Sequence, residues 1–241
     1  MKHVLRFLPL IAVVITCSCG GGNSSLSASS AQLRAIQTSG DGAGFDLRLD
    51  GKTFLGANGK TTYQSVPLGS HTLTLTNPGA GTSLASLNAS FQAGTNQTAV
   101  LAGAIEDQSL TLFTYAEDTA PPASGQIKLR FVHGAHSIGP IDIYVSDVGA
   151  GSPTPTFAKV AYRTVTPVLT RAAKDFQLCW STGSSGGLFG AFPGCAGIVG
   201  IFKVGSIPAN ATLVLPDAPI VPNAPPGLFT LGPPLMRILP N

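Results

Sequence analysis

Two pairs of matching segments recur at one spacing, and this repeat constrains the fold more than any other feature. Residues 33–36 (Leu-Arg-Ala-Ile) return ninety-six positions later as residues 129–132 (Leu-Arg-Phe-Val). Residues 45–49 return as residues 141–145 at the same spacing of ninety-six positions. The two matches therefore align without an insertion or deletion between them. Self-similarity at a fixed offset indicates that one structural unit is built twice.

The recurring segments have the pattern of β-strands. Apolar and polar residues alternate from 45 to 50, so Phe45, Leu47 and Leu49 are expected to face a core and the residues between them to face outward. A later alternating strand at 67–76 has its expected counterpart at 175–180. No window outside the first residues sustains a helical period, and Gly, Pro, Asn and Asp turns separate the runs. The sequence therefore predicts an all-β chain made of two sandwiches.

The composition of the segments between these runs sets the expected domain limits. Residues 31–118 form the first predicted β-sandwich domain and residues 126–241 the second, which includes a Pro-rich C-terminal segment with one last strand at 227–231. Residues 119–125 contain two consecutive prolines and are expected to be a stiffened linker.

The repeated strands carry a family resemblance. A strand at 129–133, a Gly/Pro turn, a strand at 141–145 and a glycine-led strand of alternating Thr and Leu resemble the bacterial family called domain of unknown function 4397. The resemblance spans about residues 31–216 in two copies and implies paired, immunoglobulin-like modules that are secreted or lipid-anchored. Family members have a His-Ala-Ser-Pro-like turn, and here Gly134-Ala135-His136-Ser137 follows His133. The first copy departs from that pattern, with Gln37 at the histidine position.

The first residues have the features of an export signal. Lys2 and Arg6 precede an apolar run of about ten residues, which is too short for the roughly 20 residues of a spanning helix. The run ends in Thr16-Cys17-Ser18-Cys19-Gly20, which resembles a bacterial lipobox. Residues 1–18 are expected to be the signal peptide, Cys19 the lipidated residue and residues 19–30 a flexible tether. Cys17 as the lipidated residue and an ordinary secretory signal cleaved nearby are the alternatives.

Charge and leader together predict where the protein is and what it does not bind. Without Lys2 and Arg6, 12 basic side chains face 11 acidic ones, a formal charge of +1. A nearly neutral chain has no electrostatic attraction to nucleic acid. We expect a cell-envelope protein held outside the cytoplasm by its N-terminal lipid, in the outer membrane or periplasm.

Two cysteines remain outside the leader. Cys179 and Cys195 are separated by 15 residues, and an oxidising compartment favours a disulfide between them. Closing such a loop adds about 3 kcal/mol in the chain-entropy model. Two buried free thiols are the alternative.

Two motifs could carry chemistry. His133 and His136 have the spacing of a metal-binding pair, with Asp142 nearby, but residues three apart on a strand point to opposite faces, so a local hydrogen bond of His133 is favoured. Residues 183–187 match the G-x-S-x-G nucleophile pattern at Ser184 and Ser185. No helical pattern and no histidine follows, so the match is attributed to chance. We predict no catalytic residue, no metal and no cofactor.

The sequence is less informative about partners. The predicted loop at 181–194 contains three apolar residues, Leu188, Phe189 and Phe192, and is the predicted partner-binding loop. An envelope protein or a glycan is the expected partner, and Trp180 is expected in the core rather than on a sugar platform. The resulting hypothesis is a binding or structural module, with a mechanical spacer or an envelope hydrolase that uses the 181–194 loop or a metal near His133 as alternatives.

Overall fold

The computed structural model describes residues 30–39, 44–55, 62–79, 81–105, 108–150, 154–182, 197–216 and 237–240. These residues form sixteen β-strands, and no helix occurs among them. No helix capable of crossing a membrane is present in this described part. The first eight strands are β1 (Ala31–Gln37), β2 (Asp46–Leu49), β3 (Lys52–Leu55), β4 (Gln64–Val66), β5 (Gly69–Thr76), β6 (Ser83–Phe91), β7 (Asn96–Ala102) and β8 (Thr111–Ala116). The next eight are β9 (Gln126–His133), β10 (Ile141–Asp147), β11 (Phe157–Val160), β12 (Leu169–Ala172), β13 (Phe176–Ser181), β14 (Gly197–Phe202), β15 (Asn210–Leu215) and β16 (Arg237–Pro240).

The strands form four sheets of four strands, and the second pair of sheets repeats the first. The orders β4-β1-β7-β8 and β3-β2-β5-β6 return as β12-β9-β15-β16 and β11-β10-β13-β14. Every strand of the first unit thus has its equivalent eight strands later. β1 pairs with β7 in parallel, and β9 pairs with β15 in the same way. The predicted all-β sandwich fold is confirmed.

Each pair of sheets encloses its own apolar core, as the alternation predicts. Leu33 of β1, Leu47 of β2 and Leu73 of β5 are fully buried in the first core. Leu129 of β9 and Ile143 of β10 are buried in the second. Side chains two apart on a strand point to the same face, which is why a two-residue alternation forms one buried stripe per strand.

A two-residue turn sets the register of the first β2–β3 hairpin. Asp50 and Gly51 both have positive φ, 49° and 79°, and Leu49 pairs with Lys52 across the turn. An Asp-Gly pair with two positive φ angles has the type I′ geometry that matches the twist of the flanking strands.

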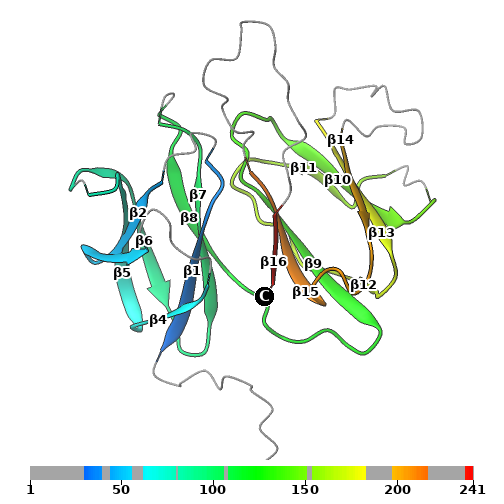
Figure 1. Cartoon of the computed structure of the whole chain (residues 1–241), viewed down its shortest axis with the longest axis horizontal. Coiled ribbons are helices and arrows are strands. Elements are labelled where there is room, and N and C mark those ends of the chain that lie inside the picture. The colour runs from blue at the N-terminus through cyan, green and yellow to red at the C-terminus, as the bar shows by residue number, and fades with distance from the viewer. Residues whose placement is uncertain are drawn as a thin grey trace, which may run out of the picture.

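A third apolar cluster joins the two sandwiches. It contains Ile36 and Val100 from the first unit and Val132 and Val214 from the second, all almost fully buried. Figure 1 shows the sheet of β1 and the sheet of β9 next to each other in the middle of the molecule. We call this interface between the two sheets the seam. The predicted strand at 227–231 lies outside the described residues, and the strand that pairs with β15 is β16.

Candidate functional site

One buried carboxylate of the seam contacts both sandwiches. Glu117 follows β8, and its side chain has no exposed surface. Its Oε1 accepts hydrogen bonds from Arg34 Nη2 at 2.7 Å and from Thr98 Oγ1 at 2.6 Å. Its Oε2 accepts one from Thr212 Oγ1 of the second sandwich at 3.3 Å, and Arg130 Nη1 lies 3.8 Å away. A single acid therefore bonds to both sandwiches.

The partners of this acid occupy equivalent places in the two sandwiches. Arg34 is opposite Thr98 in the β1–β7 register, and Arg130 is opposite Thr212 in the β9–β15 register. The seam is therefore close to two-fold symmetric, like the interface of a homodimer. Glu117 breaks this symmetry, since one carboxylate serves two guanidiniums.

Two tyrosines enclose the charged groups. The Arg34 guanidinium carbon lies 4.6 Å from the Tyr63 ring centre, and that of Arg130 lies 5.7 Å from the Tyr115 ring centre. Both distances suit cation–π attraction. Burial, and next the charge of Glu117, raise the pKa of Tyr63 to about 12, and the same two causes raise the pKa of Tyr115 well above its usual range. Both phenols stay neutral at physiological pH.

The backbones of the two sandwiches also come close at the seam. Thr38 Oγ1 lies 2.9 Å from the Leu101 carbonyl oxygen and 3.3 Å from that of Gly134 in the other unit. A Cβ atom on Gly134 would stand only 2.6 Å from Thr38 Oγ1. Glycine is therefore required here for close approach.

The polar contacts of the seam connect the two sandwiches to each other. The acceptor oxygens of Glu117 are bonded to groups of both sandwiches, and the side chain has no exposed surface. A buried charged group is tolerated only when it is paired and hydrogen-bonded. The arrangement suits holding the sandwiches in one orientation.

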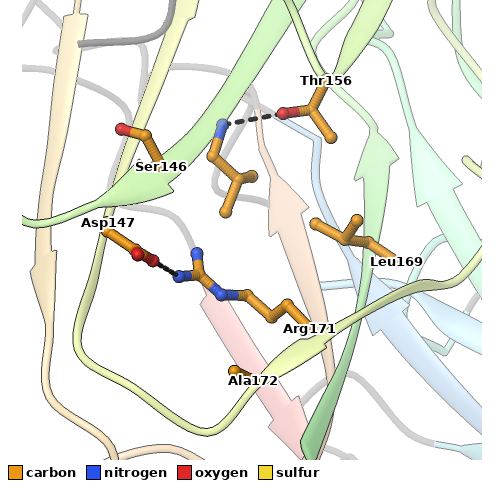
Figure 2. Close-up of a pocket in the computed structure, with 7 residues that line it drawn as sticks. Ser146, Asp147, Thr156, Leu169, Arg171 and Ala172 are labelled. Atoms are coloured by element: carbon orange, nitrogen blue, oxygen red, sulfur yellow. Dashed lines mark hydrogen bonds and ion pairs between the residues drawn. The ribbon is translucent and has the colours of Figure 1, made fainter. Parts of the chain in front are cut away.

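The second sandwich has an open pocket of about 310 Å³ between β10 and β12. Figure 2 shows Arg171 reaching across it to Asp147, with which it forms an ion pair. The Arg171 guanidinium carbon also lies 4.9 Å from the centre of the Phe176 ring. The lining residues are Val145, Ser146, Asp147, Thr156, Leu169, Arg171 and Ala172.

A histidine–carboxylate pair closes the β2–β3 hairpin against β5. His71 Nδ1 lies 2.6 Å from Asp50 Oδ2, and the Thr72 amide donates to Asp50 Oδ1 at 2.9 Å. The hydrogen bond with Asp50 raises the pKa of His71, and the same bond lowers the pKa of Asp50. His71 Nε2 lies 3.2 Å from the Leu68 carbonyl oxygen, so both ring nitrogens contact groups that secure the turn.

The candidate metal residues of the sequence are engaged in other contacts. His133 is buried in β9, with Nε2 3.2 Å from the Gly139 carbonyl oxygen. The rings of His133 and His136 both contact the Tyr162 ring edge-on, at 6.3 and 6.2 Å between centres. Asp142 accepts a hydrogen bond from the Lys159 amide at 2.7 Å. Among the described residues, no three His, Cys, Asp or Glu side chains are grouped to hold a metal ion.

Only some of the other predicted residues lie within the described part of the chain. Cys179 and Trp180 are both buried in β13, and Cys179 is disulfide-bonded. Its predicted partner Cys195 lies outside the described residues, so that pairing stays a prediction. The same holds for the remaining predicted site and motif residues, which are Cys17, Cys19, Ser184, Ser185, Leu188, Phe189 and Phe192.

The seam was not predicted from the sequence, although one signal for it is present. Ile36 and Val132 occupy the strand face opposite to Leu33 and Leu129, the face that is exposed when a sheet is buried on one side only. Apolar residues on both faces of a strand indicate that both faces are buried. Glu117 itself has no such signal, since its partners are brought together only by the fold.

Comparison with known proteins agrees with the resemblance seen in the sequence. The molecule is an all-β protein of two equivalent sandwiches. Residues 31–144 match the family model "Domain of unknown function (DUF4397)", the family that the repeated strands resemble. The match covers the first sandwich and continues into β9 and β10 of the second.

Other comparisons add little. A solved structure described as "Alpha-glucan binding by a streptococcal virulence factor" is similar over 77% of this chain and 93% of its own, at 12% identity and a TM-score of 0.27. A TM-score of this size does not define a common fold. No relative is found among curated proteins.

Proposed function

We propose that this chain is a lipid-anchored cell-envelope protein whose two sandwiches act together as one rigid binding or structural module, without catalytic activity. The observation that carries the proposal is the buried Glu117 carboxylate, which bonds to Arg34 in one sandwich and to Thr212 in the other. Paired domains that rotate freely have polar interfaces with few buried contacts. The seam instead has a shared apolar cluster and a fully buried charge.

Rigidity suits a module that presents a surface to a partner. Ordering two domains before binding lowers the entropy lost on association. Loops mounted on such a scaffold are where binding residues concentrate. The envelope location rests on the leader and on Cys19 as the lipidated residue. The expected partner is an envelope protein or a glycan.

The experiment uses residues 20–241 immobilised without lipid and exposed to solubilised envelope extract. Captured proteins and glycans are identified by mass spectrometry, for the intact chain and for a chain with a shortened 181–194 loop. Specific capture that depends on that loop, or on the pocket of the second sandwich, supports a binding module. Turnover of ester, peptide or glycosidic test substrates that is lost in Ser184→Ala, Ser185→Ala or His133→Gln would instead establish the hydrolase alternative.

The spacer alternative is favoured by the same seam, since a rigid pair also sets a distance. A spacer would capture no specific partner, and replacing the residues of the pocket would leave its role unchanged. The capture experiment therefore separates the two.

A further inference from the structure

The open pocket between β10 and β12 combines apolar side chains with one ion pair. The aliphatic side chains of Val145 and Leu169 line it, and Arg171 and Asp147 form an ion pair at its side (Figure 2). A volume of about 310 Å³ is at the lower end of small-molecule sites. Apolar walls with a few convergent polar groups are the usual character of such sites.

The strand pairing explains why the pocket is open. β11 pairs with β10 only at Ile141 and Ile143, so the C-terminal half of β10 has no neighbour from β11. The Val145 amide donates instead to Thr156 Oγ1 at 3.0 Å. The separation of β11 from β10 leaves space beside Leu169 and Arg171 of β12.

The polar groups retain hydrogen-bonding capacity. Arg171 uses Nη2 for Asp147, and within the described residues its buried Nε has no hydrogen-bond partner. The Asp147 side chain is 62% exposed, which makes this ion pair inexpensive to rearrange. The Arg171 guanidinium also lies against the Phe176 ring, and this cation–π contact holds it in place beside Asp147.

We propose that this pocket binds one neutral sugar unit, an inference that rests on the proposed binding function. Neighbouring hydroxyls of a sugar both accept and donate, so one can accept from Arg171 while the next donates to Asp147. The C–H face of the ring then lies on Val145 and Leu169. A carboxylate ligand would be repelled by Asp147 and an ammonium ligand by Arg171, so the pair as a whole selects a ligand without net charge.

The test is NMR titration of the lipid-free chain, residues 20–241, with glucose, galactose, mannose and N-acetylglucosamine at up to roughly tens of millimolar. Glucuronate and glucosamine are the charged counterparts. We expect at least one neutral sugar to shift the amides of Val145, Leu169, Arg171 and Ala172, and to bind more tightly than either charged sugar. Absence of shifts with every neutral sugar, shifts elsewhere only, or tighter binding of a charged sugar would overturn the proposal.

Variants separate recognition from folding. Arg171→Met keeps the aliphatic stem and should weaken neutral-sugar binding by about tenfold or more. Asp147→Asn keeps the shape of an exposed side chain and removes its charge. It should weaken binding of the neutral sugar and make glucuronate the preferred ligand. The matched control Lys203→Gln removes an exposed charge between β14 and β15. It should change neither the affinity for the neutral sugar nor the preference over charged sugars. Unchanged selectivity in Asp147→Asn would contradict the charge argument. Loss of the sugar site with retained envelope capture would leave the proposed function standing.

Discussion

Arg34 and Arg130 occupy equivalent positions in two sandwiches, and both guanidiniums lie beside one carboxylate, with Nη atoms 2.7 and 3.8 Å from Glu117. The Arg34 side chain is only 2% exposed. A guanidinium at such depth requires a counter-charge, because water cannot reach it. Glu117 neutralises Arg34 of the first sandwich and also lies beside Arg130 of the second. The stabilities of the two sandwiches are coupled through this acid.

Replacing that acid should destabilise the protein strongly. Glu117→Gln keeps the size of the side chain but leaves the buried Arg34 guanidinium without the negative charge that neutralises it. We expect a loss of about 3 kcal/mol or more in the free energy of unfolding, measured by urea denaturation. The control is Asp118→Asn, which removes a partly exposed ion pair with Lys128 (2.8 Å) and should cost less than about 1 kcal/mol. Equal losses in the two variants would refute the special role of Glu117.

The close approach at Gly134 gives a second test of the seam. Gly134→Ala places a methyl group against Thr38 Oγ1, where there is no room. We expect a cost of about 1–3 kcal/mol on thermal or urea unfolding, as for other overpacked sites. Gly139→Ala is the matched control, because a Cβ there meets nothing within 4 Å. If Gly134→Ala were as mild as Gly139→Ala, the two units would not be in contact as described.

Stability should depend on pH through His71 and Asp50. The pKa of His71 is raised, so its contribution is fully present below its ordinary value of 6.5 and is lost as the pH rises through the raised pKa. The pKa of Asp50 is lowered, so its contribution is full above 3.8 and is lost as the pH falls through the lowered pKa. The pair is therefore fully effective between those two values.

The measurement is a histidine NMR titration in wild type and Asp50→Asn. We expect the His71 pKa to fall towards its ordinary value in the variant, and the loss of stability above pH 6.5 to diminish. A His71 pKa that does not respond to Asp50→Asn would show that the hydrogen bond does not control the titration.

Anchoring is tested by cysteine replacement in the full chain with its leader. Cys19→Ala should move the protein from the membrane fraction to the soluble one, since a lipid supplies about 0.8 kcal/mol per buried methylene. Cys17→Ala is the matched control and should stay in the membrane fraction. Retention of Cys19→Ala in membranes would contradict the assignment of Cys19.

How much the sequence revealed depended on which face of a strand a residue occupies. Leu33, Leu47 and Leu129 belong to inward stripes; the alternation at 45–50 predicted a core-facing stripe, and the repeated segments predicted the doubled unit. Ile36 and Val132 lie on the opposite face, where alternation alone assigns solvent, so the seam was missed. Glu117 is joined to Arg34 over 83 positions and to Thr212 over 95, and no local pattern reports contacts of that range. The Arg171–Asp147 pair spans 24 positions and was missed for the same reason.

The most direct test of the rigid pair is to cut the linker after folding. A protease site replaces residues 121–124 in the lipid-free chain, which leaves Asp118 and its contacts with Lys128 and Asn210 unchanged. After cleavage we expect the two halves to co-elute on size-exclusion chromatography in native buffer and to separate only in denaturant. Halves that separate at once in native buffer would show that the linker alone, and not the seam, holds the sandwiches together.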